Sequence, residues 1–267
     1  MEGELILFPD YLELQKEVEK LRTELSMLVL EQDELQYVIC RNIETEYMLK
    51  LGGLEYRVFK AQCEALRLRR KMEMIQAAMN RQERVDLGQI ESRLDLEFVE
   101  YQRRLDEQIS RMNDALERRQ MRKLTEDQTM ELKKLYRAVV KVLHPDLNPN
   151  ISDEEERIFS KAVDAYQNGD LETMRIIHEM ITNHQIRGFD VGAMKQLEKE
   201  KERLREHIRQ VQERILRIKS QYPYTMLELL KDEQKIEAKK AELNVLLSRY
   251  EEMGEAYQVR IRRMSGE

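Results

Sequence analysis

Apolar residues recur along the first forty positions at alternating steps of four and three, and this spacing constrains the fold more than any other feature. The seam follows Pro9 and Asp10, which supply a helix start signal, and it contains one polar position. Its members are Leu14, Val18, Leu21, Leu25, Leu28, Gln32, Leu35 and Ile39. Such spacing is the heptad pattern of a coiled coil. A helix of about forty residues would be roughly 60 Å long, so it needs a partner helix.

The next segment carries a seam with the same spacing. Its members are Leu54, Val58, Ala61, Ala65, Leu68, Met72 and Ile75. Because Gly52-Gly53 separates the two seams, we expect an antiparallel helical hairpin that turns at these glycines. One kinked helix remains the alternative. A third helix is expected from Ile90 to Leu116, with a repeat closer to eleven residues and hence a nearly straight crossing.

The C-terminal third repeats the theme. One heptad seam runs from Met194 to Ile218 and includes Lys201. Beyond Pro223, apolar side chains recur every seven residues, at Leu229, Ile236, Leu243, Tyr250 and Tyr257. Proline inside a continuous helix costs ~3 kcal/mol or more, whereas it fits the tip of a hairpin. We therefore predict a second antiparallel hairpin with its tip near Pro223, where Thr225 caps the returning helix.

Residues that break regular helix are scarce in this chain. It has nine Gly and four Pro in 267 residues, where average usage would give roughly thirty. The expected fold class is therefore all-α, with long coiled-coil helical hairpins flanking a central helical module. We expect N-terminal coiled-coil helices over residues 1–123, the central module over 124–184 and the C-terminal hairpin over 185–267.

Composition also narrows the classes of function. A formal net charge of −6 gives no general basic field, so nucleic acid is not an expected partner. No stretch approaches the ~20 apolar residues of a membrane span and no signal peptide is evident, so we expect a cytoplasmic protein without membrane partners. Cys40 and Cys63 are far apart, and the four His lack metal-ligand spacing. No disulfide, metal or cofactor is expected.

The central module opens with a helix whose two ends are both marked. Thr125 and Gln128 form a capping-box pattern, and the helix should stop at His144 because Pro145 follows it. Its apolar face comprises Leu132, Tyr136, Val139, Val140 and Leu143. Lys133, Arg137 and Lys141 follow one another at steps of four and therefore form one basic stripe.

A second helix of the module should start at Ser152 or Asp153, since its first turn is rich in acidic residues. Its core face would comprise Phe159, Ala162, Val163 and Tyr166, and Asn168-Gly169-Asp170 should end it. A further helix is expected over 171–181.

At these residues the sequence resembles a J domain, the Hsp40/DnaJ-type module that stimulates the ATPase of DnaK-type chaperones. The resemblance rests on Tyr136-Arg137-Ala138-Val139-Val140-Lys141-Val142-Leu143-His144-Pro145-Asp146-Leu147-Asn148-Pro149, on Phe159 and on Ala165-Tyr166. It implies that Asp146 pairs with an arginine of the chaperone near its interdomain linker. The basic residues Lys133, Arg137 and Lys141 would meet an acidic patch, while Tyr136, Val139, Leu143, Phe159 and Tyr166 would form the module core.

The sequence also departs from the family. The short first helix of a J domain, with its Tyr and Leu-Gly, is not evident before Thr125. Ala138 and Leu147 stand where the family has basic residues. A Gly/Phe-rich linker and zinc-binding CxxCxGxG repeats are missing, so the client-binding apparatus of full-length DnaJ is absent. The resemblance covers residues 124–184 and indicates a specialised J-domain protein.

Two functions from different classes follow. The first is a J-domain co-chaperone that docks on a DnaK-type chaperone through His144, Pro145 and Asp146, with coiled-coil arms that recruit a client or partner. The second is a non-catalytic coiled-coil scaffold, in which the tripeptide only turns a helical hairpin. The seams could bury each other or pair in a homodimer. An enzyme is not expected, because no nucleophile elbow, P-loop or dinucleotide glycine fingerprint occurs.

Overall fold

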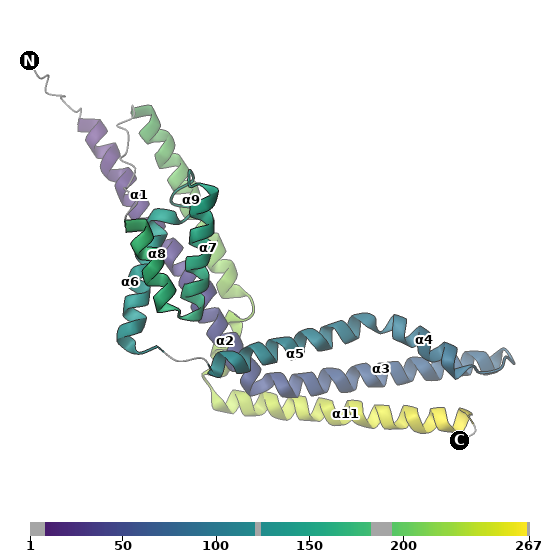
Figure 1. Cartoon of the computed structure of the whole chain (residues 1–267). Coiled ribbons are helices and arrows are strands. Elements are labelled where there is room, and N and C mark those ends of the chain that lie inside the picture. The colour runs from purple at the N-terminus through teal and green to yellow at the C-terminus, as the bar shows by residue number, and fades with distance from the viewer. Residues whose placement is uncertain (1–8, 121–123, 183–193, 266–267) are drawn as a thin grey trace, which may run out of the picture. The chain divides into compact units, whose positions relative to one another are not determined.

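The structure, a computed structural model, describes residues 9–120, 124–182 and 194–265 (Figure 1). These residues form helices and contain no strand, which confirms the predicted all-α fold. The chain divides into two compact units. Unit 1 comprises residues 1–41 and 122–225, and unit 2 comprises residues 42–121 and 226–267. The predicted domain boundaries at 123/124 and 184/185 lie at or outside the limits of the described residues.

Helical structure continues without a loop from Pro9 to Asn80. It comprises five consecutive elements.

 In chain order, the five elements are α1 (Pro9–Asp33), the π-helix η1 (Glu34–Ile39), α2 (Cys40–Tyr47), the π-helix η2 (Met48–Gly52) and α3 (Gly53–Asn80). Gly52 (φ −55°, ψ −41°) and Gly53 (φ −64°, ψ −35°) both have right-handed helical dihedral angles. The chain therefore does not reverse at these glycines, and the alternative of a continuing helix is what the structure shows.

Gly52 has a packing role instead. A Cβ atom at this position would lie 3.0 Å from Met48 Sδ and 3.5 Å from Met112 Cγ. Met112 belongs to α5 (Val99–Gln120), which passes close to the backbone here. The missing side chain thus lets another helix approach, and this requirement cannot be read from the local sequence.

Unit 1 is built on a parallel pair of helices, α1 and α9 (Met194–Ser220), which lie side by side in Figure 1. Glu17 pairs with Lys201 at 2.7 Å, and Glu31 pairs with Lys219 at 2.8 Å. From the first pair to the second, the residue number increases on α1 and also on α9, so the two helices run in the same direction. The buried seam residues are Leu14, Val18, Leu25 and Val29 on α1, and Leu204, Ile208, Val211 and Ile215 on α9.

Unit 2 is also built on a parallel pair, formed by α3 and α11 (Glu233–Ser265). Lys50 lies 3.9 Å from Glu233 at one end of this pair, and Ile75 and Ile261 share a core cluster at the other. The buried residues of α11 are Ile236, Leu243, Leu247 and Ile261.

Two further helices, α4 (Leu87–Glu97) and α5, return along α3 in the opposite direction. Arg67 pairs with Glu91 at 2.7 Å, while the rings of Phe59 and Tyr101 are 6.5 Å apart. The predicted third helix is therefore present, but a turn at Phe98 divides it in two.

The C-terminal pairing differs from the prediction. The chain does leave the helix near Pro223, through the 3-10 helix η3 (Tyr224–Met226) and the short α10 (Leu227–Leu230). However, the seam of α9 packs on α1 and that of α11 packs on α3, so each of these two seams is covered by a helix from the N-terminal part of the chain. Thr225 lies inside η3, and Asp232 caps α11 instead by accepting from the N–H of Gln234 at 3.0 Å. Heptad spacing identifies a buried face but not the helix that covers it.

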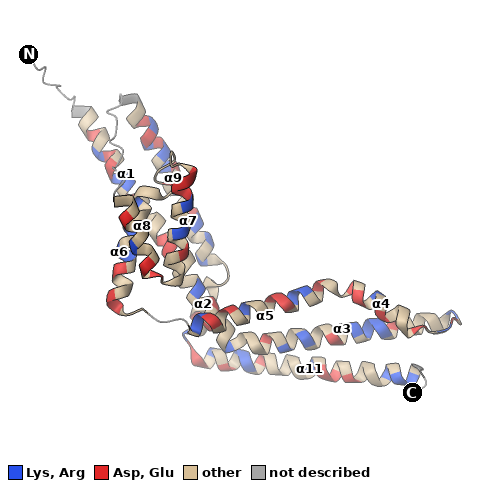
Figure 2. Ribbon diagram, in the orientation of Figure 1, with Lys and Arg blue, Asp and Glu red and all other residues tan. Residues whose placement is uncertain are grey.

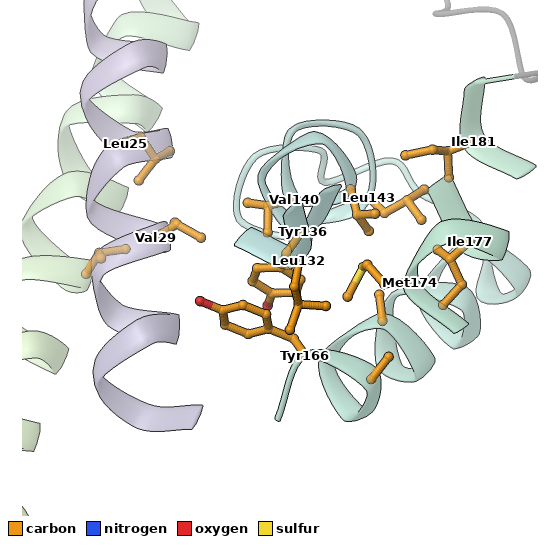
Figure 3. Packing of buried hydrophobic residues seen from close by; sticks show 14 of the residues in the cluster. Leu25, Val29, Leu132, Tyr136, Val140, Leu143, Tyr166, Met174, Ile177 and Ile181 are labelled. Atoms are coloured by element: carbon orange, nitrogen blue, oxygen red, sulfur yellow. The ribbon is translucent and has the colours of Figure 1, made fainter. Parts of the chain in front are cut away.

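The remaining helices form the central module of unit 1. They are α6 (Glu126–Leu143), α7 (Asp153–Asn168) and α8 (Leu171–Thr182), which pack on one another. Figure 3 shows how α1 closes one side of this module: Leu25 and Val29 face Tyr136 and Tyr166, whereas Met174 of α8 lies on the other side. The core of the module is therefore continuous with the seam between α1 and α9.

Candidate functional site

The two helices that flank the His-Pro-Asp segment are fixed by local caps. Thr125 and Gln128 form a reciprocal capping box at the start of α6. Ser152 and Glu155 form another at the start of α7, which ends at Gly169 in the left-handed conformation (φ 69°). These caps satisfy backbone N–H groups that a helix end leaves without partners. They set the two ends of the connection that carries the candidate site.

The His-Pro-Asp loop, residues 144–148, is ordered by His144. Its backbone N–H donates to Val140 O at 3.0 Å and ends α6, while its Nδ1 accepts from the N–H of Asp146 at 3.0 Å. The imidazole is buried and meets the Phe159 ring edge to face at 5.0 Å. Burial lowers the pKa of His144 to about 4, with the nearby Asp146 opposing and Arg214 adding to that shift. A neutral imidazole therefore holds the turn in place.

Asp146 is held by two side chains of α9. Its Oδ2 accepts from Arg214 Nη2 at 2.5 Å, and its backbone oxygen lies 3.3 Å from His207 Nδ1. The Asp146 side chain is 25% exposed and that of Arg214 is 41% exposed. Arg214 Nε is buried and has no hydrogen-bond partner among the described residues. The carboxylate expected to meet a chaperone thus has an intramolecular partner at the edge of the solvent.

The predicted basic stripe is divided between two environments. Lys133 Nζ pairs with Glu34 Oε1 of η1 at 2.5 Å. Arg137 and Lys141 are exposed and form no ion pair with any residue that the structure describes. Lys134, which the sequence analysis did not single out, is also exposed on α6. The open cationic surface of the module is therefore made by Lys134, Arg137 and Lys141.

The predicted core residues lie together beneath the loop. Tyr136 and Tyr166 stack with ring centroids 4.0 Å apart and planes 1° from parallel. Val139 and Leu143 are buried in the same cluster, and Phe159 is partly buried against it. This packing gives α6 and α7 a fixed spacing, so the two ends of the loop between them are held in place.

A buried carboxyl group adjoins this core. Tyr136 Oη donates to Asp33 Oδ2 at 2.8 Å, and Asp33 is almost fully buried. Burial raises the pKa of Asp33 to about 6, and the charge of Asp146 acts in the same direction. The hydrogen bond from Tyr136 and the charge of Arg214 oppose this rise. Asp33, Asp146, Arg214 and His144 consequently form one electrostatically coupled cluster.

Sequence analysis missed two members of this cluster, Asp33 and Arg214, and also missed His207, which lies against the Asp146 backbone oxygen. His207 and Arg214 are seven residues apart, and each immediately precedes a buried seam residue. This spacing places His207 and Arg214 on the same edge of the seam, and such a pattern predicts contact with a neighbouring element. The identity of the neighbour is set by tertiary packing. Asp33 lies off the predicted seam and gave no comparable signal.

No family model matches this chain, and no curated protein or solved structure matches it significantly. None of the described helices combines the length and apolar character needed to cross a membrane. Within the described ranges, no three His, Cys, Asp or Glu side chains gather as metal ligands would. Lys and Arg alternate with Asp and Glu along the helices of both units (Figure 2).

Proposed function

We propose that this protein is a J-domain-type co-chaperone, which docks on a DnaK-type chaperone through its His-Pro-Asp loop and stimulates ATP hydrolysis by that chaperone. The observation that supports the proposal is the loop itself: His144, Pro145 and Asp146 join two capped, mutually packed helices, and the Asp146 carboxylate lies at the solvent edge. The chain supplies a docking surface and carries out no chemistry of its own.

Each part of the loop has a distinct role in this proposal. His144 orders the turn through its bond from the Asp146 N–H, and Pro145 keeps His144 out of the helical conformation. Asp146 accepts a hydrogen bond from an arginine of the chaperone. The exposed cations Arg137 and Lys141 face an acidic surface of the chaperone, which favours orientation and a fast association rate over raw affinity.

The coiled-coil pairs act as arms in the same proposal. The pair α1 and α9 carries the central module in unit 1, and unit 2 would recruit a client or partner protein in the cytoplasm. Because the seams of α1, α3, α9 and α11 bury one another within the chain, a homodimer through these seams is not needed to cover them. Mixed charges along the helices do not favour a nucleic acid as partner (Figure 2).

The decisive experiment is single-turnover ATP hydrolysis by a DnaK-type chaperone, with and without the protein. We expect the wild type to accelerate hydrolysis and Asp146→Asn to abolish that acceleration. Asp153→Asn is the matched control, because Asp153 is an exposed acidic residue of the neighbouring helix. Circular dichroism should show the same helicity for all three proteins. Equal stimulation by the wild type and Asp146→Asn would refute the proposal.

A second candidate function is a coiled-coil scaffold in which the module serves only as a docking or spacing element. The observation that favours it is that Asp146 and Lys133 already pair with Arg214 and Glu34 of the same chain. The variant Arg137→Glu separates the two functions. In the co-chaperone it lowers the association rate with the chaperone in a salt-dependent manner. A scaffold shows no stimulation and no chaperone binding with either protein.

A further inference from the structure

Helix α9 contacts the His-Pro-Asp loop at Asp146, through both the side chain and the backbone of that residue. Arg214 bonds the Asp146 carboxylate at 2.5 Å, and His207 lies 3.3 Å from the Asp146 backbone oxygen. The two α9 residues are seven apart and therefore share one edge of the helix. Packing of the α9 seam on α1 holds that edge against the loop.

A second contact closes the same side of the module. Lys133 pairs with Glu34 at 2.5 Å, whereas Arg137 and Lys141 on the outer face of α6 stay exposed. The side that faces α1 and α9 is therefore occupied by partners from the chain itself. The outer face is open to a partner.

We propose that α9 keeps the His-Pro-Asp loop in a closed state, in which the guanidinium of Arg214 is bound to the Asp146 carboxylate. A partner must displace Arg214 from Asp146 with a guanidinium of its own. This inference rests on the proposed function. It adds that the docking site is masked in the resting protein and that Arg214 sets how readily it opens.

The geometry of the ion pair favours such an exchange. Arg214 donates to the Asp146 carboxylate through Nη2, while its buried Nε has no partner among the residues that the structure describes. A guanidinium that binds a carboxylate with two parallel hydrogen bonds is held more strongly than this. Because the Arg214 side chain is 41% exposed, it can rotate into solvent.

The rest of the module need not move when the pair opens. Tyr136 and Tyr166 pack against Leu25 and Val29 of α1, as Figure 3 shows, and this apolar contact does not involve Arg214. Opening is therefore a local change at the loop. It leaves the helices and their core in place.

The test uses the full chain and a DnaK-type chaperone. We expect Arg214→Gln to lower the protein concentration that gives half-maximal ATPase stimulation by about fivefold, as loss of a partly exposed ion pair implies. Arg214→Lys should stay within about twofold of the wild type because it keeps the charge. Arg217→Gln is the matched control, since Arg217 is exposed on the same helix. Thermal unfolding should confirm that all variants are folded.

Hydrogen exchange provides a readout that does not involve the chaperone. The amides of Asp146, Leu147 and Asn148 all donate to His144, and we expect them to exchange severalfold faster in Arg214→Gln than in the wild type. Stimulation at lower concentration by Arg214→Gln, or stimulation by that variant alone, supports the closed state. Equal stimulation curves for Arg214→Gln and the wild type overturn it and leave the proposed function intact. Absence of stimulation by every variant overturns the proposed function and this inference together, and faster exchange would then assign Arg214 to loop stability alone.

Discussion

Two buried ionisable side chains of unit 1 respond to burial in opposite ways. The pKa of His144 is lowered from 6.5 to about 4, and that of Asp33 is raised from 3.8 to about 6. Between pH 4 and 6.5 the unfolded chain binds more protons at His144, so this residue makes stability rise with pH. Between pH 3.8 and 6 the folded chain binds more protons at Asp33, so its contribution is lost as pH rises through 6. The two effects oppose each other from about pH 4 to 6.

We therefore predict that Asp33→Asn makes the free energy of unfolding rise more steeply with pH between about 4 and 6. The difference from the wild type across this window should reach up to about 3 kcal/mol. The groups that face Asp33 are Tyr37, Tyr136, Asp146 and Arg214. Urea unfolding at several pH values measures the effect, with Asp153→Asn as an exposed control. Parallel pH profiles for Asp33→Asn and the wild type would contradict it.

The hydrogen bond between Tyr136 and Asp33 gives a second prediction. Tyr136→Phe leaves a buried carboxyl group without its donor, which should cost about 1–3 kcal/mol of stability. The loss should be larger at pH 8 than at pH 5, because the hydroxyl stabilises the ionised carboxylate. Tyr166→Phe keeps the stacked ring of the neighbouring tyrosine and serves as the control. A loss that is independent of pH would show that Asp33 is not the group concerned.

At the scale of elements, sequence predicted what depends on local chemistry. The capping boxes of α6 and α7 and the left-handed Gly169 follow from residues three or four positions apart, so the module helices were placed to within a few residues. The glycines at 52 and 53 were misread because a Gly-Gly pair also suits a turn. Their helical conformation depends on α5 packing close by, which local sequence does not encode.

Gly53 provides a direct test of this difference. It is exposed and helical, and an added Cβ would lie 3.8 Å from Met112 Cε, an ordinary contact. Gly53→Ala should therefore stabilise the protein by up to about 1 kcal/mol, since alanine loses less backbone entropy in a helix. Gly169→Ala should destabilise it, because φ is 69° there. Thermal unfolding of both variants measures this, and destabilisation by Gly53→Ala would indicate a turn at Gly53.

At the scale of the whole molecule, sequence identified the apolar seams but not their partners. Sequential helices can always form hairpins, so Pro223 and the seams on either side suggested that residues 194–265 fold back on themselves. In each unit the observed partner comes from the other end of the chain and runs parallel. A parallel pair requires a long connection between its two helices. The spacing of apolar residues within one helix does not indicate how far along the chain its partner lies. The candidate site shows the same limit, since Arg214 reaches Asp146 from 68 residues away.

Parallel pairing in unit 1 can be checked by crosslinking native side chains. A zero-length carbodiimide reagent joins a carboxylate to an amine in contact with it, and we expect links between Glu17 and Lys201 and between Glu31 and Lys219. Mass spectrometry of the monomer should detect both. Lys219→Arg should remove only the second link. Links in the reverse order, Glu17 to Lys219 and Glu31 to Lys201, would indicate an antiparallel pair.

The parallel pairing also determines what the ribosome exposes during synthesis. Arg22 of α1 and Glu200 of α9 pair across 178 residues. At about 5–20 residues per second, roughly 9–36 s pass between the appearance of one helix and that of its partner. During this interval α9 is not yet present to cover the seam of α1, and the seam of α3 likewise lacks α11. The nascent chain therefore presents two long apolar stripes at once, which is the kind of surface that chaperones bind, and we expect it to need their help to fold.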